Sequence, residues 1–232
     1  MIYQGSKNKI AKYILPIMLE ERKEGQAWVE PFVGGANLID KVSGERFGND
    51  SNIYLISLLK AVQNGWVPPT TVSKEDYYAI KSNPENYSTE LYAFVAFLCS
   101  FGGKFWGGYA SNKINTNYAD TGSRVITKQA QNLSGIIFTA TCYSKMLIPP
   151  NSLIYCDPPY QGKTGYKNKF NNKEFWEWAR IMTVKGHTVF VSEYNAPDDF
   201  ECIIEIDHKS VMNKNKPKKT KEKLFRYKNV LR

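Results

Sequence analysis

The sequence predicts an α/β fold, in which a mostly parallel sheet carries a small, mainly helical insertion. Three observations predict it. A strand, a glycine turn and a helix follow one another from Ala27, which is how a βαβ unit begins. A second short strand at 46–49 leads directly into another helix. The apolar run from Ser152 to Cys156 is typical of a buried strand, and it stops at Asp157 because two prolines follow.

Length and composition limit the classes of protein. A chain of 232 residues with 42% hydrophobic residues can form one α/β domain, or a core domain with an insertion, and global disorder is excluded. No apolar run approaches the ~20 residues of a membrane span, and the N-terminus lacks the pattern of a signal peptide, so we expect no membrane partner. A formal net charge of +9 favours a polyanionic partner, with nucleic acid ahead of an anionic membrane surface.

The cysteines and histidines argue against a metal-binding protein and against a disulfide-stabilised one. The 4 cysteines are widely spaced and form no C-x-x-C pair, which disfavours a zinc ribbon and a disulfide framework. With only His187 and His208 in the chain, a histidine-based metal site and a Ser-His-Asp triad are also disfavoured, and we expect no metal. A reduced, cytoplasmic setting fits these features.

The first part of the chain alternates helices with short strands. An apolar stripe at helical spacing predicts the first helix, and Pro16 is expected to kink it. Asp50-Ser51-Asn52 supplies an N-cap for the helix that follows the second strand. The expected elements are a helix at 7–21, a strand at 27–32, a helix from about Asn37, a strand at 46–49 and a helix at 53–63.

The remaining chain is helical, then polar, then rich in strands. Glycines and aromatic residues are mixed from Phe101 to Tyr109, and the polar stretch from Ser111 to Ser123 predicts a long loop. In the middle we expect helices at 74–81, 89–101 and 126–133, and a strand at 136–141. After the strand at 152–156 we expect a helix capped by Asn172 and strands at 187–193, 203–206 and 224–230.

Two strand ends supply a cofactor site. The first strand ends in Glu30-Pro31-Phe32-Val33-Gly34-Gly35, and the next ends at Asp50. A glycine turn lets the backbone approach a ligand, and an acid at the neighbouring strand end accepts hydrogen bonds from ribose hydroxyls. The dinucleotide pattern G-x-G-x-x-G is missing, so a cofactor with a ribose but no phosphate fits better. S-adenosylmethionine is such a molecule, and the acidic Glu30 suits it.

Asp157-Pro158-Pro159-Tyr160 can activate the exocyclic amine of a nucleobase. Such an amine is a poor nucleophile, because its lone pair is delocalised into the ring. Hydrogen bonds from its hydrogens to the Asp157 carboxylate and the Pro158 carbonyl favour the pyramidal form that attacks, and Tyr160 can stack on the base. The base must leave the duplex for this chemistry. Taken alone, a Pro-Pro turn after a strand also has a plain structural explanation.

Motifs along nearly the whole chain resemble those of the Dam-like N6-adenine DNA methyltransferases. The segment Tyr3-Gln4-Gly5-Ser6-Lys7 resembles the family's N-terminal aromatic-x-Gly-x-Lys motif. The later matches are Glu30 to Gly35 with E-P-F-x-G-x-G, Asp50-Ser51-Asn52 with D-x-N, Asp157 to Tyr160 with D-P-P-Y, and the segments 192–194 and 220–225. Two departures stand out: Ala36 replaces a usual glycine, and Thr141-Cys142-Tyr143 lacks the acid that often precedes that tyrosine.

The resemblance implies a fold, a division of the chain and a set of site residues. The fold is a Rossmann-like S-adenosylmethionine-dependent methyltransferase sheet, mostly parallel with an antiparallel terminal strand. Residues 1–64 and 125–232 form its catalytic domain, and residues 65–124 form an inserted recognition region. The implied cofactor contacts are Tyr3, Lys7, Glu30, Phe32, Gly34, Asp50 and Asp157. The implied catalytic residues are Asp157, Pro158, Pro159 and Tyr160.

We therefore expect methyl transfer to adenine N6 in a short duplex DNA site such as GATC, carried out by a monomer or a weak dimer. Cytosine N4 methylation, an RNA substrate and a non-catalytic DNA-binding module are the alternatives. A lid is expected at 163–173, while the segment 101–109 either reads DNA or is a tight turn with core aromatics. The expected contacts to phosphates or base edges are Lys104, Asn112, Lys113, Asn115, Arg124, Lys214, Lys216, Lys218 and Lys219.

Overall fold

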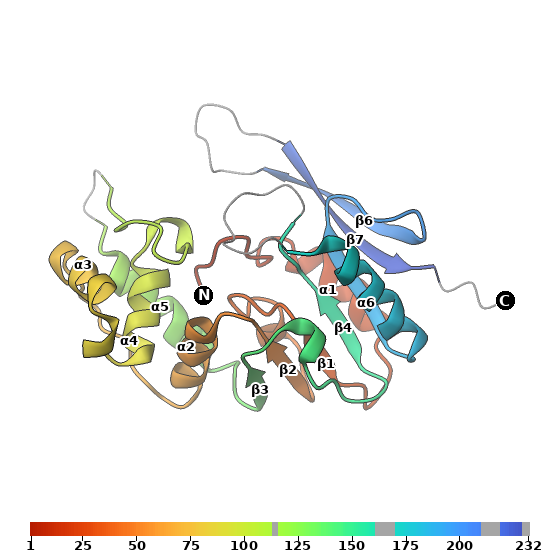
Figure 1. Cartoon of the computed structure of the whole chain (residues 1–232), viewed down its shortest axis with the longest axis horizontal. Helices are drawn as coiled ribbons and strands as arrows, with labels where there is room; N and C mark the ends of the chain where they lie inside the picture. Colours follow the sequence, from red (N-terminus) through yellow and green to blue (C-terminus); the bar gives the residue numbers. More distant parts are fainter. Residues whose placement is uncertain (113–115, 161–169, 210–218, 229–232) are drawn as a thin grey trace.

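The computed structural model of the chain describes residues 1–112, 116–160, 170–209 and 219–228. Within these ranges the core is a sheet of 7 strands in the order β3-β2-β1-β4-β5-β7-β6 (Figure 1). The strands from β3 to β5 are parallel, and β7 runs antiparallel to both β5 and β6, so the predicted mostly parallel sheet is confirmed. The strands are β1 (Trp28–Glu30), β2 (Arg46–Asn49), β3 (Ile136–Thr139), β4 (Leu153–Cys156), β5 (Thr188–Glu193), β6 (Phe200–Lys209) and β7 (Lys219–Tyr227).

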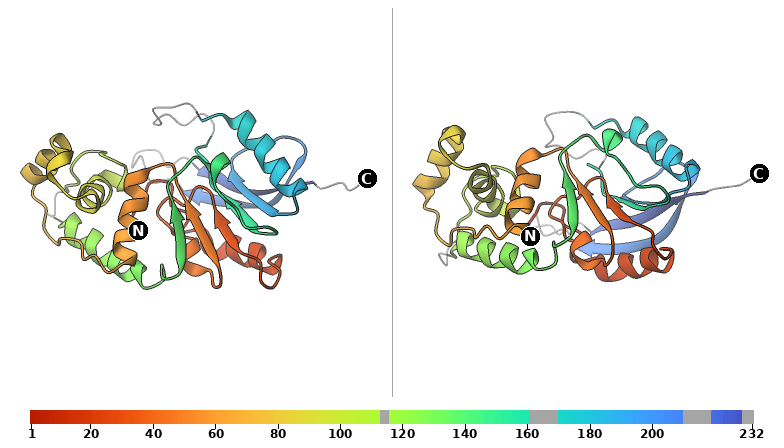
Figure 2. Two further views of the ribbon diagram at one scale, coloured as in Figure 1. Left: turned by 60° about the horizontal axis from the view of Figure 1, so that its bottom comes forward. Right: turned by 90° about the horizontal axis from the view of Figure 1, so that it is seen from below.

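The helices pack in two groups. α1 and α6 cover opposite faces of the sheet, as Figure 2 shows, whereas α2 to α5 lie together beyond β3. Asn52 caps α2 as predicted, but the cap of α6 is Asn171 rather than Asn172, because Asn171 accepts the backbone N–H of Glu174 at 3.2 Å. Among the described residues, none of the helices combines the length and apolar character needed to cross a bilayer. The helices are α1 (Ala11–Glu20), α2 (Ile53–Gln63), α3 (Lys74–Ser82), α4 (Thr89–Leu98), α5 (Tyr118–Ala130) and α6 (Asn172–Val184).

Strand β4, at the centre of the sheet, is apolar at every position. Leu153 and Tyr155 belong to a hydrophobic cluster that includes α1, whereas Ile154 and Cys156 belong to a second cluster that includes α6. Successive side chains of a strand point to opposite faces, so a strand covered on both faces needs an uninterrupted apolar run. The burial of both faces makes β4 a rigid base for the residues that follow it.

Helix α5 begins earlier than the sequence predicts. The stretch 111–123 is expected to be a loop, but α5 starts at Tyr118, with the side chain of Asn117 as its N-cap. Gly122 lies so close to α4 that a Cβ atom there would stand 2.8 Å from the Cβ of Leu98. Close packing of the two helices therefore outweighs the low helix propensity of this polar, glycine-containing segment.

Other elements also differ from the prediction. The helix expected from Asn37 is only a single 3-10 turn at Ile39–Lys41, because the backbone carbonyls just before it accept hydrogen bonds from side chains instead of helical N–H groups. The first helix begins at Ala11, which leaves Lys7 in the preceding turn. The expected end of the inserted region, after residue 124, falls inside α5.

The C-terminal strands are longer than predicted and form a hairpin. β6 extends over Phe200–Lys209, and β7 starts at Lys219 rather than at Leu224. β7 also pairs with β5, where Lys223 lies opposite Glu193 at the end of β5. The antiparallel direction of β7 brings Glu222 to the edge of the sheet at which the parallel strands end.

The segment from Phe101 to Tyr109 divides between the two alternatives considered for it. Its Trp106 packs inward, with the indole N–H donating to the Tyr92 hydroxyl at 2.9 Å, so most of the aromatic residues are core. Phe101 is 71% exposed, however, and Lys104 is also exposed. The turn with core aromatics therefore presents an apolar ring and a cation to solvent.

Candidate active site

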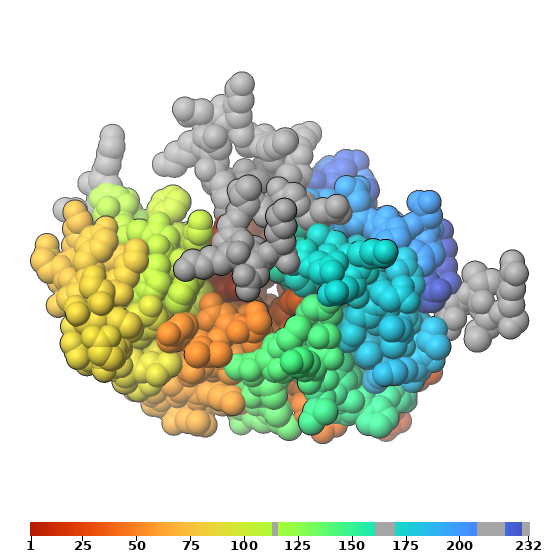
Figure 3. All heavy atoms as spheres, in the orientation of Figure 1, coloured from red at the N-terminus to blue at the C-terminus, as the bar shows by residue number. Residues whose placement is uncertain are grey.

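Three parallel strands deliver acidic residues to one edge of the sheet. Glu30 ends β1, Asp50 follows β2, Asp157 follows β4, and β1 lies between the other two strands. The carboxyl ends of parallel strands meet at the same edge, so motifs distant in sequence converge there. The face drawn in Figure 3 is hollowed at its centre, between α2, coloured orange, and the start of α6, coloured cyan.

Lys7 joins two carboxylates and an aromatic ring in what we call the Lys7 cluster: Lys7, Asp157, Tyr160 and Glu222. The Lys7 ammonium lies 2.8 Å from Asp157 Oδ1 and 3.2 Å from Glu222 Oε1, and 4.6 Å from the centre of the Tyr160 ring. The Tyr160 hydroxyl donates to the same oxygen of Glu222. Lys7, Tyr160 and Glu222 are buried. The N-terminal motif and D-P-P-Y thus meet directly, with β7 as a third contributor.

Within the described residues, the Lys7 cluster holds two carboxylates against one ammonium. Burial disfavours charged Lys7, but attraction to Asp157 and Glu222 outweighs this effect and raises the pKa of Lys7. Burial raises the pKa of Asp157; the ion pair with Lys7 opposes the shift, and repulsion from Glu222 adds to it. Lys7 therefore stays protonated, and Asp157 is a more basic acceptor than an ordinary aspartate.

The two predicted cofactor carboxylates have different surroundings. Glu30 is buried and accepts the indole N–H of Trp28 at 2.9 Å; burial raises the pKa of Glu30 to about 8, although this hydrogen bond opposes the shift. Asp50 accepts the backbone N–H groups of Gly34 at 3.3 Å and Asn52 at 2.9 Å. Removal from water raises the pKa of Asp50, although these two donors favour its ionised form.

The glycine turn packs tightly against the N-terminal motif. Gly34 has a φ of +49°, and a Cβ atom there would stand 2.9 Å from the ring of Tyr3. The ring of Tyr3 also lies near that of Phe97 of α4, with ring centres 5.8 Å apart. Ala36 has a φ of 56°, so replacing the family's glycine places an alanine in the left-handed region, which costs roughly 1–2 kcal/mol.

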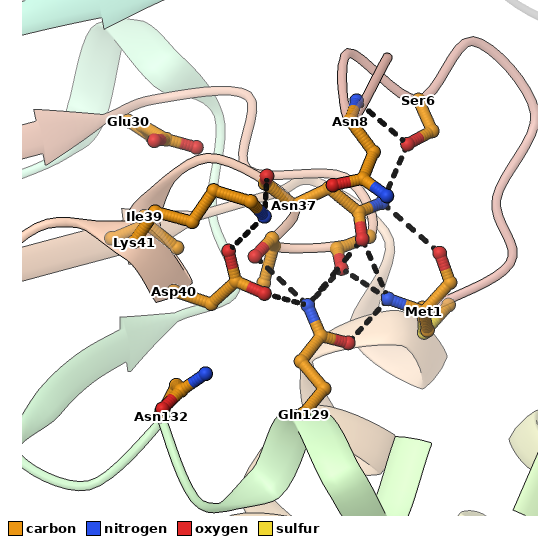
Figure 4. A network of polar contacts seen from close by, with 12 residues as sticks. Met1, Ser6, Asn8, Glu30, Asn37, Ile39, Asp40, Lys41, Gln129 and Asn132 are labelled. Carbon is orange, nitrogen blue, oxygen red and sulfur yellow. Dashed lines mark hydrogen bonds and ion pairs between the residues drawn. The ribbon is translucent and has the colours of Figure 1, made fainter. Parts of the chain in front are cut away.

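A polar network ties this turn to α5 (Figure 4). The side-chain amide of Gln129 donates to the carbonyl oxygens of Gly35 at 3.0 Å and Ala36 at 2.9 Å, and it lies 2.9 Å from Asp40 Oδ2. The carbonyl oxygen of the same side chain accepts the backbone amine of Met1. One buried glutamine therefore connects the outer helical group, the glycine turn and the N-terminal segment.

Phe32 belongs to an aromatic cluster, and the two prolines differ in their exposure. The ring of Phe32 is in an aromatic cluster, 5.1 Å from the ring of Tyr143 and 5.7 Å from that of Phe175. Tyr143 belongs to the segment in which the family's acid is missing, and here it packs on Phe32. Pro158 is buried and Pro159 is partly exposed. Phe32 thus supports the edge from the second hydrophobic cluster.

The predicted DNA contacts are spread over several elements. Lys104 is exposed, and its loop lies beside the N-terminal motif because the Gly103 carbonyl accepts the backbone N–H of Gln4 at 3.3 Å. Asn112 is exposed, and Arg124 is exposed on α5 with Asp120 at 2.9 Å. Lys219 opens β7. Outside the described residues lie Lys113, Asn115, Lys214, Lys216, Lys218 and residues 163–169 of the expected lid.

Two residues at this site were not among the predicted site residues. Glu222 lies within a segment that resembles the family, but its spacing from D-P-P-Y gives no sign that it contacts Tyr160. The alternation of Lys221, Glu222 and Lys223 along a strand was a usable signal. Successive side chains point to opposite faces, so with the two lysines facing solvent the acid faces inward. Gln129 carries no motif, and a glutamine in a polar helix gives no indication of its burial.

The motifs gathered at this edge lie within a stretch of sequence that matches a known protein family. A sequence profile described as D12 class N6 adenine-specific DNA methyltransferase matches residues 3–197. The matched range contains the N-terminal motif, the glycine turn, Asp50 and D-P-P-Y. The chain belongs to this family. For a D12 methyltransferase the sheet described above is the expected Rossmann-like methyltransferase sheet, and the cofactor is S-adenosylmethionine, which confirms both predictions.

Two further proteins are similar to this D12 chain. The type II methyltransferase M.FokI of Planomicrobium okeanokoites is 22% identical over 209 residues, which cover 79% of this chain and 32% of M.FokI. The chain therefore spans about a third of the length of that relative. The crystal structure of SMU.472 complexed with SAH matches 95% of this chain and 52% of its own at 8% identity, with a TM-score of 0.36, which is too low to carry an argument.

The residues at the edge fit S-adenosylmethionine. Glu30 is a buried carboxyl group whose ionised form a bound ammonium group would stabilise, and Asp50 offers oxygens to ribose hydroxyls. Gly34 lies so close to Tyr3 that a side chain there would displace the ring, so a glycine keeps the aromatic residue of the N-terminal motif against the turn. Among the described residues, no group of three or more His, Cys, Asp or Glu side chains is arranged to hold a metal ion.

Proposed function

We propose that this protein transfers a methyl group from S-adenosylmethionine to the N6 amine of adenine in duplex DNA. The observation that carries the proposal is the ion pair between Lys7 and Asp157 beside the ring of Tyr160. A nitrogen with N–H donors is held on the carboxylate of D-P-P-Y, next to an aromatic ring. An adenine amine in the active complex needs a similar arrangement.

The chemistry assigns a separate role to each residue of D-P-P-Y. Asp157 accepts one hydrogen of the amine and the Pro158 carbonyl accepts the other, which concentrates the lone pair on nitrogen. Tyr160 stacks on the extruded base, and Pro159 keeps the turn rigid. The cofactor supplies a methyl group on a cationic sulfur, which leaves as neutral thioether. The surplus amine proton leaves along the hydrogen bond to Asp157.

Lys7 must leave Asp157 before the base can bind. Its ammonium lies on the oxygen that the amine requires, 2.8 Å away, and over the ring that the base would face. Lys7 therefore acts as a stand-in for the substrate amine in the free protein. Tyr3, Glu30, Phe32, Gly34 and Asp50 complete the cofactor side in this proposal.

The proposed recognition region, at about 65–124, contains α3, α4 and the first part of α5. Its loop at 101–109 lies beside the N-terminal motif and exposes Phe101 and Lys104. With a formal net charge of +9, this basic protein suits a phosphate backbone. We further propose a short target such as GATC and a cytoplasmic location, since the four cysteines are free, which fits a reducing compartment.

The test is methylation of an unmethylated plasmid by the purified protein with isotopically labelled S-adenosylmethionine. Digestion to nucleosides should yield N6-methyladenine, and mapping the modified positions should give one short sequence. N4-methylcytosine would select the cytosine alternative, and preferential labelling of RNA in a competition would select the RNA alternative. Binding to DNA without label in any substrate would support the non-catalytic alternative.

A further inference from the structure

A second carboxylate in the Lys7 cluster has no place in the D-P-P-Y chemistry. Glu222 comes from β7, is 7% exposed, and touches both Lys7 and Tyr160. It shares its face of the strand with Leu224, a core residue that is 1% exposed. A glutamate at an inward-facing strand position is rare unless it is paired, which indicates that it serves the site.

We propose that Glu222 is a positioning residue that allows Asp157 to exchange the Lys7 ammonium for the amine of the target base. The inference rests on the proposed methyl transfer. Glu222 keeps the displaced ammonium paired and holds the Tyr160 hydroxyl in place while the base enters. Glu222 itself does not contact the reacting atoms.

The energetics of a buried ammonium explain why a second partner is needed. If Asp157 were the only partner of Lys7, the incoming amine would leave a buried cation unpaired, which is strongly unfavourable. With Glu222 at 3.2 Å, Lys7 loses one of its two carboxylate partners and keeps the other, together with the neutral Gly5 carbonyl that it contacts at 3.3 Å. The exchange then replaces one charge-assisted hydrogen bond of Asp157 by another, so its free-energy change stays small.

The same charges predict that neutralising Glu222 speeds methyl transfer when Lys7 is absent, whereas it slows transfer when Lys7 is present. Asp157 and Glu222 would then face each other without a cation, and like carboxylates in one buried site share a proton. A proton on Asp157 removes the acceptor that the amine needs. Neutralising Glu222 would remove this repulsion and leave Asp157 ionised.

The experiment measures single-turnover methyl transfer to an adenine-containing duplex. Glu222→Gln preserves shape and an acceptor for Tyr160, and it should slow transfer roughly tenfold, the effect of about 1.4 kcal/mol. Lys7→Met should slow transfer more, because the cofactor side also loses a residue. In the Lys7→Met background, adding Glu222→Gln should raise the rate several-fold above that of Lys7→Met alone. Glu205→Gln, on the exposed part of the same hairpin, is the matched control and should stay within twofold of wild type.

The outcomes separate this inference from the proposed function. An inactive wild type on every DNA contradicts the proposed function itself. An active wild type with Glu222→Gln within twofold of it, or with Glu222→Gln slowing transfer in both backgrounds, overturns the positioning role. Circular dichroism melts verify folding, and Lys7→Gln replaces Lys7→Met if the double variant does not fold. The inference is supported if Glu222→Gln slows transfer in the wild-type background and speeds it in the Lys7→Met background. A merely structural role would lower the rate in both.

Discussion

The side-chain amide of Gln129 donates to the carbonyl oxygen of Gly35 at 3.0 Å, which joins the helical group at the edge of the sheet to the glycine turn. Gly35 precedes Ala36, which already lies in the left-handed region at a φ of 56°. The turn is therefore held in its shape from outside, by a residue of α5. Any movement of α5 on DNA would be transmitted to this turn through one buried side chain.

Replacing Gln129 should affect both stability and cofactor affinity. Gln129→Ala leaves buried carbonyl oxygens without their donor, so we expect a loss of about 1–3 kcal/mol in the free energy of unfolding. We also expect weaker binding of S-adenosylmethionine, measured by calorimetry at a temperature where the variant is folded. Gln131→Ala, at the exposed C-cap residue directly after the same helix, is the control. Unchanged cofactor affinity in Gln129→Ala would show that the tether serves stability alone.

Neutralising Asp157 should stop methyl transfer without unfolding the protein. In Asp157→Asn, Lys7 keeps Glu222 as its partner, so the cluster holds one positive and one negative charge and remains balanced. We expect the single-turnover rate to fall roughly a hundred- to thousandfold, because the acceptor of the amine is lost. DNA affinity, measured by fluorescence anisotropy, should change little. Asp207→Asn, at an exposed position of β6, should behave as wild type, and an equally active Asp157→Asn would contradict the assigned role.

The buried Glu30 should make stability depend on pH between about 4.5 and 8. Burial raises the pKa of Glu30 from 4.5 to about 8, so the folded state binds its proton more tightly than the unfolded state. The stabilisation of the folded state by this proton is fully present below pH 4.5, and it is lost as pH rises through about 8. Glu30→Gln should therefore gain stability relative to wild type on going from pH 5 to pH 9, measured by urea unfolding. The exposed Glu24→Gln should show no such trend, and a parallel result for both variants would rule out the shift.

The exposed ring of Phe101 should contribute to DNA binding. Stacking of one base on an aromatic side chain is worth about 1–3 kcal/mol, so Phe101→Ala should weaken binding to duplex DNA by roughly tenfold or more. Because Phe101 is 71% exposed, its removal should leave the melting temperature almost unchanged. Leu147→Ala, at a side chain that is 91% exposed elsewhere on the surface, is the control. Equal DNA affinities of both variants would remove Phe101 from the interface.

Lys104 should contribute to DNA binding through its charge alone. Lys104→Gln should weaken binding to specific and non-specific DNA by the same factor and lower the slope of log affinity against log salt by about 1. The exposed Lys12 on α1 provides the matched substitution Lys12→Gln. A loss confined to one DNA sequence would instead assign Lys104 to a base edge.

The strand ends could be predicted because the relevant signals are local. Two prolines after an apolar run end β4 at Cys156 wherever the rest of the chain lies, and Asn52 caps α2 through its own neighbours. The convergence of Glu30, Asp50 and Asp157 follows from a single rule, that parallel strands end at the same edge. Charge and motif spacing then predicted the family.

Contacts between distant segments were decided only by the tertiary structure. Helix α5 starts at Tyr118 because Gly122 allows contact with Leu98, a gain that local propensity does not contain. Glu222 reaches Tyr160, and Gln129 reaches Gly35, through an antiparallel hairpin and a helix whose placement no short motif specifies. The sequence by itself determined which residues end the strands, since backbone chemistry acts over a few residues. The folded chain decided which polar groups share a buried site, since the stability of a buried charge depends on whatever partner the packing brings to it.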